Sequence, residues 1–204
     1  MPEYFLYHIG ACNPPTDAGR FPLSDRFLRH SPLMFVDYPG RESLRHIYGT
    51  LMVGTLKLVP PCKDMATNLA NAMVQFWVES AKHFTTDMQP HYLYSPRELT
   101  RWKVAILEAI HGEGGDNLSP LEMTRLYLHE AGRIFIDRLV NLDERAWSNE
   151  QLDNIAREYL SAGDRELKRP IFFSKALFTI TTFRLLMLII LKSFCVFFGL
   201  PQVF

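Results

Sequence analysis

Apolar residues recur every three or four positions through the middle of the chain, which is the spacing of amphipathic helices. Two of these stretches open with a Ser-Pro pair, Ser95-Pro96 and Ser119-Pro120. Serine caps a helix N-terminus and proline at the first helical position loses no hydrogen bond, so each pair indicates a helix start. Glu122 can complete a capping box with Ser119. The pattern predicts helices over residues 41–59, 65–84, 95–111, 119–139 and 148–160.

The same periodicity predicts which face each helix buries. Because the apolar faces can meet one another, we expect a helical bundle. The expected buried residues are Leu44, Ile47, Tyr48 and Leu51 on the first helix, Met65, Leu69, Met73, Phe76, Trp77 and Phe84 on the second, Leu99, Trp102, Ile106 and Ile110 on the third, and Leu121, Leu128, Ala131, Phe135 and Leu139 on the fourth.

The first forty residues have a different pattern, typical of the end of an α/β domain. Residues 4–12 are β-prone and predict a strand, and the prolines within residues 12–17 predict a loop after it. A short helix is expected within residues 23–30. Residues 33–36 are a continuous apolar run, as in a strand that is buried on both faces.

Composition and charge exclude several functions. The 204 residues carry 22 basic and 22 acidic side chains, so a basic nucleic-acid-binding face is not expected. The three cysteines include no CxxC pair and no histidine pair has zinc spacing, so neither disulfides nor a metal site are expected. This cysteine usage favours a reducing, intracellular compartment. No acidic residue follows Glu166, which separates residues 167–204 from the rest.

One candidate for chemistry lies where the first predicted strand ends. In open α/β sheets, ligands gather outside the carboxyl ends of the strands. Asn13 has this position and could orient a water molecule or a phosphate oxygen. The alternative is that Asn13 and Asp17 hydrogen-bond the backbone of their own loop.

Three arginines are candidates for phosphate binding, because the planar guanidinium donates paired hydrogen bonds and is always charged. Arg26 and Arg29 flank Phe27-Leu28 of the predicted short helix. Arg97 lies in the first turn of the helix that begins after Ser95, where the helix dipole disfavours a cation. The alternatives are that the first two are solvated surface residues and that Glu98 offsets the charge of Arg97.

Several catalytic motifs are absent from the sequence. His129-Glu130 is followed by Ala-Gly-Arg, so the second histidine of an HExxH zinc site is missing. The chain contains no GxSxG, no GxGxxG and no GxxxxGK[ST]. The last absence matters most, because no P-loop in this sequence can cradle a triphosphate.

Four segments in fixed order resemble the dynein heavy chain family. They are IGACNPPTDAGRFPLSDRFLRHSPLMFVDYPGRESLRHIYGT, FTTDMQPHYLYSPRELTRW, HEAGRIFIDRL and LKRPIFFS. More narrowly, they resemble the second half of the third AAA+ module in the motor ring of cytoplasmic dynein. The resemblance covers residues 9–177, and the ACNPPTD segment is closer to cytoplasmic than to axonemal heavy chains.

The resemblance implies roles for three of the candidate residues. Asn13 corresponds to the sensor I asparagine, which positions the attacking water. Arg29 corresponds to the arginine finger that reaches into the nucleotide site of the preceding module, with Arg26 as the second choice. Arg97 corresponds to the sensor II arginine of the helical lid, which contacts phosphate.

The resemblance also implies a fold that is mainly α: a C-terminal remnant of the AAA+ α/β subdomain (residues 1–40) followed by a helical lid bundle (41–165). A divergent hydrophobic tail (166–204) comes after them. The implied cofactors are ATP or ADP with Mg²⁺ in the intact motor. The implied partners are the rest of the dynein heavy chain, neighbouring AAA+ modules, dynein complex subunits and microtubules, in the cytoplasm at the cytoskeleton. Since Walker A and Walker B lie upstream in the family, we expect the isolated chain to be inactive and to bind no cofactor.

The tail departs from the family, which continues with a polar, acid-rich linker. A frameshift or a retained intron explains the departure, and the chain is then a truncated gene product. The alternative is a membrane-tethered helical interaction protein, because residues 185–204 would span about 30 Å as a helix. Two residues argue against this alternative. Inserting the charged Lys192 at mid-membrane would cost about 2.5–3.5 kcal/mol, and Pro201 lies within the same span.

Overall fold

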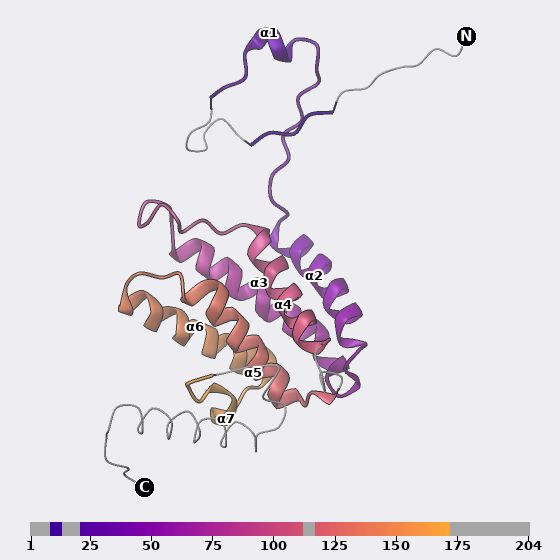
Figure 1. Cartoon of the computed structure of the whole chain (residues 1–204), viewed down its shortest axis with the longest axis vertical. Helices are drawn as coiled ribbons and strands as arrows, with labels where there is room; N and C mark the ends of the chain where they lie inside the picture. The colour runs from indigo at the N-terminus through magenta and orange to yellow at the C-terminus, as the bar shows by residue number, and fades with distance from the viewer. Residues whose placement is uncertain (1–8, 14–20, 112–116, 172–204) are drawn as a thin grey trace, which may run out of the picture. The chain divides into compact units, whose positions relative to one another are not determined.

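The computed structural model describes residues 9–13, 21–111 and 117–171. The chain divides into two units, Met1–Asp37 and Tyr38–Phe204. The second contains most of the secondary structure and the hydrophobic core (Figure 1).

In the first unit the short helix forms, but the predicted strand at residues 33–36 does not. Helix α1 spans Asp25–Leu28, within the predicted range. Residues 33–36 have no regular structure, and their side chains are 73–82% exposed. Residues 9–12 of the other predicted strand also lack regular structure, and residues 4–8 lie outside the described part. An apolar run becomes a strand only when neighbouring strands satisfy its backbone, and the described ranges contain no strand.

The second unit is helical, which confirms the prediction of a mainly α protein with a helical bundle. Helix α3 packs against α2 and against α6, and α5 contacts α4, α6 and α7 (Figure 1). The elements are α2 (Arg41–Leu56), the 3₁₀ helix η1 (Pro60–Met65), α3 (Ala66–His83), α4 (Pro96–Ile110), α5 (Pro120–Ala131), the π-helix η3 (Gly132–Ile136), α6 (Leu142–Leu160) and α7 (Asp164–Leu167).

The two Ser-Pro pairs begin helices as predicted. At α4 the Glu98 carboxylate accepts hydrogen bonds from the Ser95 backbone N–H at 2.7 Å and from the Ser95 hydroxyl at 2.9 Å. At α5 the Glu122 carboxylate accepts the equivalent bonds from Ser119, both at 2.8 Å. These capping boxes satisfy backbone donors that the helix itself leaves free.

Two helix boundaries differ from the prediction. Helix α6 begins at Leu142 rather than residue 148, because Asn141 caps it in a box with Glu144. The first turn of α6 carries the charged residues Asp143, Glu144 and Arg145, so the apolar periodicity does not reveal it. The fourth predicted helix, over residues 119–139, ends as an α-helix at Ala131 and continues as the π-helix η3.

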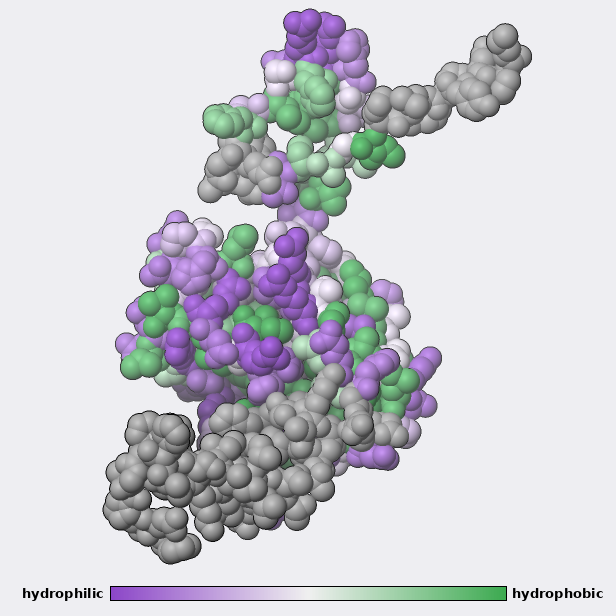
Figure 2. Space-filling model, in the orientation of Figure 1, coloured by the Kyte–Doolittle hydropathy of each residue, from purple (hydrophilic) through white to green (hydrophobic). Residues whose placement is uncertain are grey.

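Three residues that were expected in the core lie on the surface. Helix α2 buries Leu44, Tyr48, Met52 and Leu56, a stripe with a four-residue spacing. Ile47 and Leu51 lie beside this stripe and are 42% and 43% exposed, and Leu121 of α5 is 39% exposed. The surface in Figure 2 is mostly hydrophilic, with hydrophobic side chains interspersed. The apolar stripe of α2 is therefore wider than the face that its neighbours cover.

The middle of the core is an aromatic cluster that joins four helical elements, α3, α4, α5 and η3. The Trp102 ring of α4 stacks on Tyr127 of α5, with 4.8 Å between ring centroids. It meets Phe135 of η3 edge to face at 5.4 Å and Phe76 of α3 at 6.1 Å. Such pairs add about 0.5–1.5 kcal/mol each beyond the burial of their area. The cluster fixes α4 against α3 and α5.

The helices in the described ranges are all too short or too polar to cross a membrane. The span considered for a membrane, residues 185–204, lies outside the described part of the chain, as does Asp17.

Candidate functional site: the N-terminus of helix α4

Arg97 is the second residue of α4, and its side chain is exposed. Its backbone N–H donates to the Ser95 hydroxyl oxygen at 3.3 Å. Within the described ranges, its guanidinium makes no ion pair and no hydrogen bond with the protein. An arginine with a fixed backbone and an unpaired guanidinium can bind an anionic ligand.

Glu98 does not form an ion pair with Arg97. Its side chain is buried, and its carboxylate accepts the two hydrogen bonds from the Ser95 cap. Its ion-pair partner is Arg138, whose Nη1 lies 3.9 Å from Glu98 Oε1. The role of Glu98 is therefore to hold the start of α4.

Two side chains from other helices also fix this end of α4. Trp77 of α3 donates its indole N–H to the Ser95 carbonyl oxygen at 3.0 Å. The Tyr48 hydroxyl of α2 donates to the Pro96 carbonyl oxygen at 2.8 Å and lies 2.8 Å from Thr100 Oγ1. Burial raises the pKa of Tyr48 above its ordinary value of 10.0, so the hydroxyl keeps its proton at neutral pH. The backbone that carries Arg97 is thus anchored by α2 and α3.

Asn13 and Arg29 belong to the first unit, whereas Arg97 belongs to the second. Asn13 lies in a segment without regular structure and is exposed. Arg29 follows the last residue of α1, is exposed, and donates from Nε to His30 Nε2 at 2.8 Å. Arg26 lies within α1 and is also exposed. Among the described residues, no hydrogen bond or ion pair joins Asn13 to either arginine.

Glu130 forms an ion pair with Arg133 and lies close to His129. Glu130 Oε2 lies 3.1 Å from Arg133 Nη1, and Glu130 Oε1 lies 3.8 Å from His129 Nε2. His129 Nδ1 lies 3.2 Å from the Ile171 carbonyl oxygen. The residues that the structure describes include no group of three or more side chains placed to hold a metal ion.

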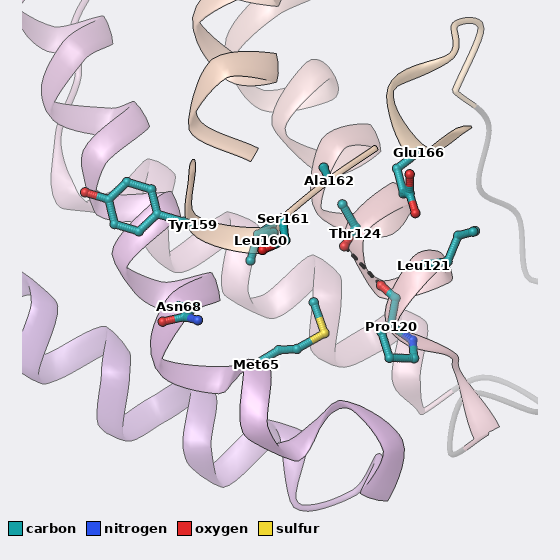
Figure 3. Close-up of a pocket in the computed structure, with 10 residues that line it drawn as sticks. All are labelled: Met65, Asn68, Pro120, Leu121, Thr124, Tyr159, Leu160, Ser161, Ala162 and Glu166. Carbon is teal, nitrogen blue, oxygen red and sulfur yellow. Dashed lines mark hydrogen bonds between the residues drawn. The ribbon is translucent and has the colours of Figure 1, made fainter. Parts of the chain in front are cut away.

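A pocket of about 370 Å³ lies elsewhere in the bundle, between the starts of α3 and α5 and the segment from α6 to α7 (Figure 3). None of the candidate residues lines it. Sequence reasoning missed this pocket because segments far apart in the chain form it. Its lining residues are Met65, Asn68, Pro120, Leu121, Thr124, Tyr159, Leu160, Ser161, Ala162 and Glu166.

Comparison with known proteins relates the helical unit to one protein family. The family model of the dynein heavy chain ATPase lid domain matches residues 51–145, which include α4 and Arg97. Cytoplasmic dynein heavy chains align over 83% of this chain, with 51% identity in Drosophila melanogaster, 50% in Caenorhabditis elegans and 49% in Dictyostelium discoideum. The chain spans about 4% of the length of these relatives.

The helical fold and the match over residues 51–145 together define the helical lid of an ATPase module. The chain belongs to the dynein heavy chain family.

Proposed function

We propose that this chain serves as the helical lid, with part of the adjoining α/β subdomain, of one AAA+ module in a cytoplasmic dynein heavy chain. In that role it contributes to an ATP-driven microtubule motor in the cytoplasm, at the cytoskeleton. Its partners are the remainder of the heavy chain, the neighbouring AAA+ modules, the other dynein subunits and microtubules. The match to cytoplasmic dynein heavy chains supports this proposal.

The observation that carries the proposal is that Arg97, within the matched lid, has a fixed backbone and a guanidinium that is exposed and, in the described ranges, unpaired. Its backbone is held by a capping box and by Trp77 and Tyr48, while its charged end is exposed and unpaired among the described residues. A lid arginine held in this way suits contact with a nucleotide phosphate. We assign Arg97 the role of the sensor II arginine.

The other two roles concern the first unit. Asn13 is the sensor I residue that orients the attacking water, and Arg29 is the arginine finger for the preceding module. Both side chains are exposed. The division between Asp37 and Tyr38 supports a subdomain boundary near residue 40, with the lid over residues 41–165.

ATP or ADP with Mg²⁺ binds to the intact motor, and this chain supplies only part of the site. Arg97 fits the phosphate groups by charge and exposure. The loop that cradles the phosphates is provided by another part of the motor, because this sequence contains no GxxxxGK[ST]. The bound nucleotide supplies the energy of phosphoanhydride hydrolysis.

Arg29 and Arg26 provide a matched pair for testing the finger assignment. The test uses a hybrid heavy chain, in which the aligned segment of the Drosophila relative is replaced by this chain's residues. We expect Arg29→Ala to lower ATP turnover by the hybrid about tenfold, because the transferring phosphoryl group loses a compensating charge. Arg26→Ala removes the same charge one helical turn earlier and is expected to have little effect.

Steady-state ATP turnover and microtubule gliding are the measurements. Equal losses from the two variants would show that only the total charge of this segment matters. Unchanged turnover and gliding in Arg29→Ala would remove the finger assignment.

A further inference from the structure

Arg138 makes several contacts with the segment that leads into α4. Its Nη2 donates to the Leu93 carbonyl oxygen at 3.0 Å and also to the His91 carbonyl oxygen. Its guanidinium carbon lies 4.6 Å from the centre of the Tyr94 ring, and its Nη1 lies 3.9 Å from Glu98 Oε1. One side chain therefore contacts the entry to α4 at four residues.

The backbone of Arg138 is fixed to the same segment. A ring nitrogen of His91 lies 3.1 Å from the Arg138 carbonyl oxygen. The Arg138 side chain is only 22% exposed and that of Glu98 only 10%, so water competes weakly for the contact between these two side chains, whereas the hydrogen bonds to His91 and Leu93 lie at the surface. Both the main chain and the side chain of Arg138 therefore bond to residues 91–95, the segment that leads into α4. These paired contacts resist both sliding and rotation of that segment.

The π-helix η3 determines where Arg138 lies. The Asp137 N–H donates to the Gly132 carbonyl oxygen at 2.9 Å, five residues back rather than four. One extra residue in a turn rotates the residues that follow by about 100° relative to a continuous α-helix. An uninterrupted α-helix would thus present a different residue to the entry of α4.

We propose that Arg138 is a positioning residue for the nucleotide site, acting through Arg97. It holds residues 91–95 in place, and through the Ser95 cap it fixes the first turn of α4 and the direction of the Arg97 side chain. This inference rests on the proposed function of Arg97. A displacement of about 1 Å at such a residue is enough to weaken a phosphate contact strongly.

The test is a double-mutant cycle in the hybrid heavy chain, with ATP affinity measured by equilibrium titration. The variants are Arg97→Ala, Arg138→Met, and both together. We expect Arg138→Met to weaken ATP binding about tenfold and to add nothing when Arg97 is already alanine, because it acts through that residue. The matched control is Arg133→Met, which removes an exposed arginine of η3 that pairs with Glu130.

The Arg138→Lys variant tests whether Arg138 acts through the geometry of its guanidinium or only through its positive charge. Lysine keeps a cation near Glu98, but its single ammonium cannot bond two carbonyls and also stack on Tyr94. We therefore expect a partial loss of ATP affinity, smaller than that of Arg138→Met. If Arg138→Met fails to fold, the cycle is run with Arg138→Lys. Thermal unfolding of each variant shows whether the loss of affinity exceeds any general destabilisation.

The outcomes distinguish the two proposals. If Arg97→Ala lowers ATP affinity but Arg138→Met and Arg138→Lys do not, the positioning role is wrong and the function of Arg97 stands. Additive losses in the double variant would also overturn the positioning role. If Arg97→Ala leaves ATP affinity unchanged, the proposed function fails, and the role of Arg138 fails with it.

Discussion

Replacement of Trp102 by alanine is expected to lower the free energy of unfolding of the helical unit by about 3–5 kcal/mol. The Trp102 side chain is fully buried, and its ring contacts the rings of Phe76, Tyr127 and Phe135. These partners come from α3, α5 and η3, so a cavity at Trp102 removes contacts from three elements at once. The rigid core cannot collapse to fill a space of that size.

Chemical denaturation followed by circular dichroism measures this loss. Leu142→Ala is the control, because Leu142 is 79% exposed and its truncation is expected to change stability by no more than about 0.5 kcal/mol. A loss below about 1 kcal/mol for Trp102→Ala would contradict the described core.

Replacement of Arg97 by alanine is expected to weaken ATP binding by the hybrid heavy chain about 10- to 100-fold. A hydrogen bond to a charged group contributes about 1.5–3 kcal/mol, and each 1.4 kcal/mol is a factor of ten in affinity. The stability of the lid is expected to change little, because the Arg97 side chain is exposed and makes no ion pair or hydrogen bond within the described ranges. The variant thus separates ligand binding from folding.

Equilibrium titration with ATP and thermal unfolding of the same samples test this expectation. Arg157→Ala is the control, because it removes a half-exposed arginine of α6, 3.7 Å from the fully exposed Asp164 carboxylate. Surface pairs of this kind contribute little to stability. Equal ATP affinities for the Arg97 and Arg157 variants would remove the sensor II assignment.

The features that depend on neighbouring residues in the sequence were predictable. The starts of α4 and α5 are encoded by Ser-Pro followed by glutamate, and both capping boxes form. The buried faces of α3 and α4 follow from their periodicity, with Phe76 and Trp102 in the core. Arg97 stands out in the sequence because a cation in the first turn of a helix opposes the helix dipole.

The features that depend on distant partners were not predictable. Residues 33–36 have the composition of a buried strand, but a strand also requires a neighbour. The surface position of Ile47 depends on how much of α2 its neighbours cover. The hydrogen bonds from Tyr48 and Arg138 to the entry of α4 join residues more than forty positions apart, and periodicity carries no information on such pairs.

The most direct test of the account is ATP turnover by the purified chain of residues 1–204, measured beside the hybrid heavy chain. The account holds that this chain senses nucleotide but does not cradle its phosphates. It predicts turnover by the hybrid, reduced in Arg97→Ala, and no turnover by the purified chain alone. Hydrolysis by the purified chain that Asn13→Ala abolishes would contradict the account.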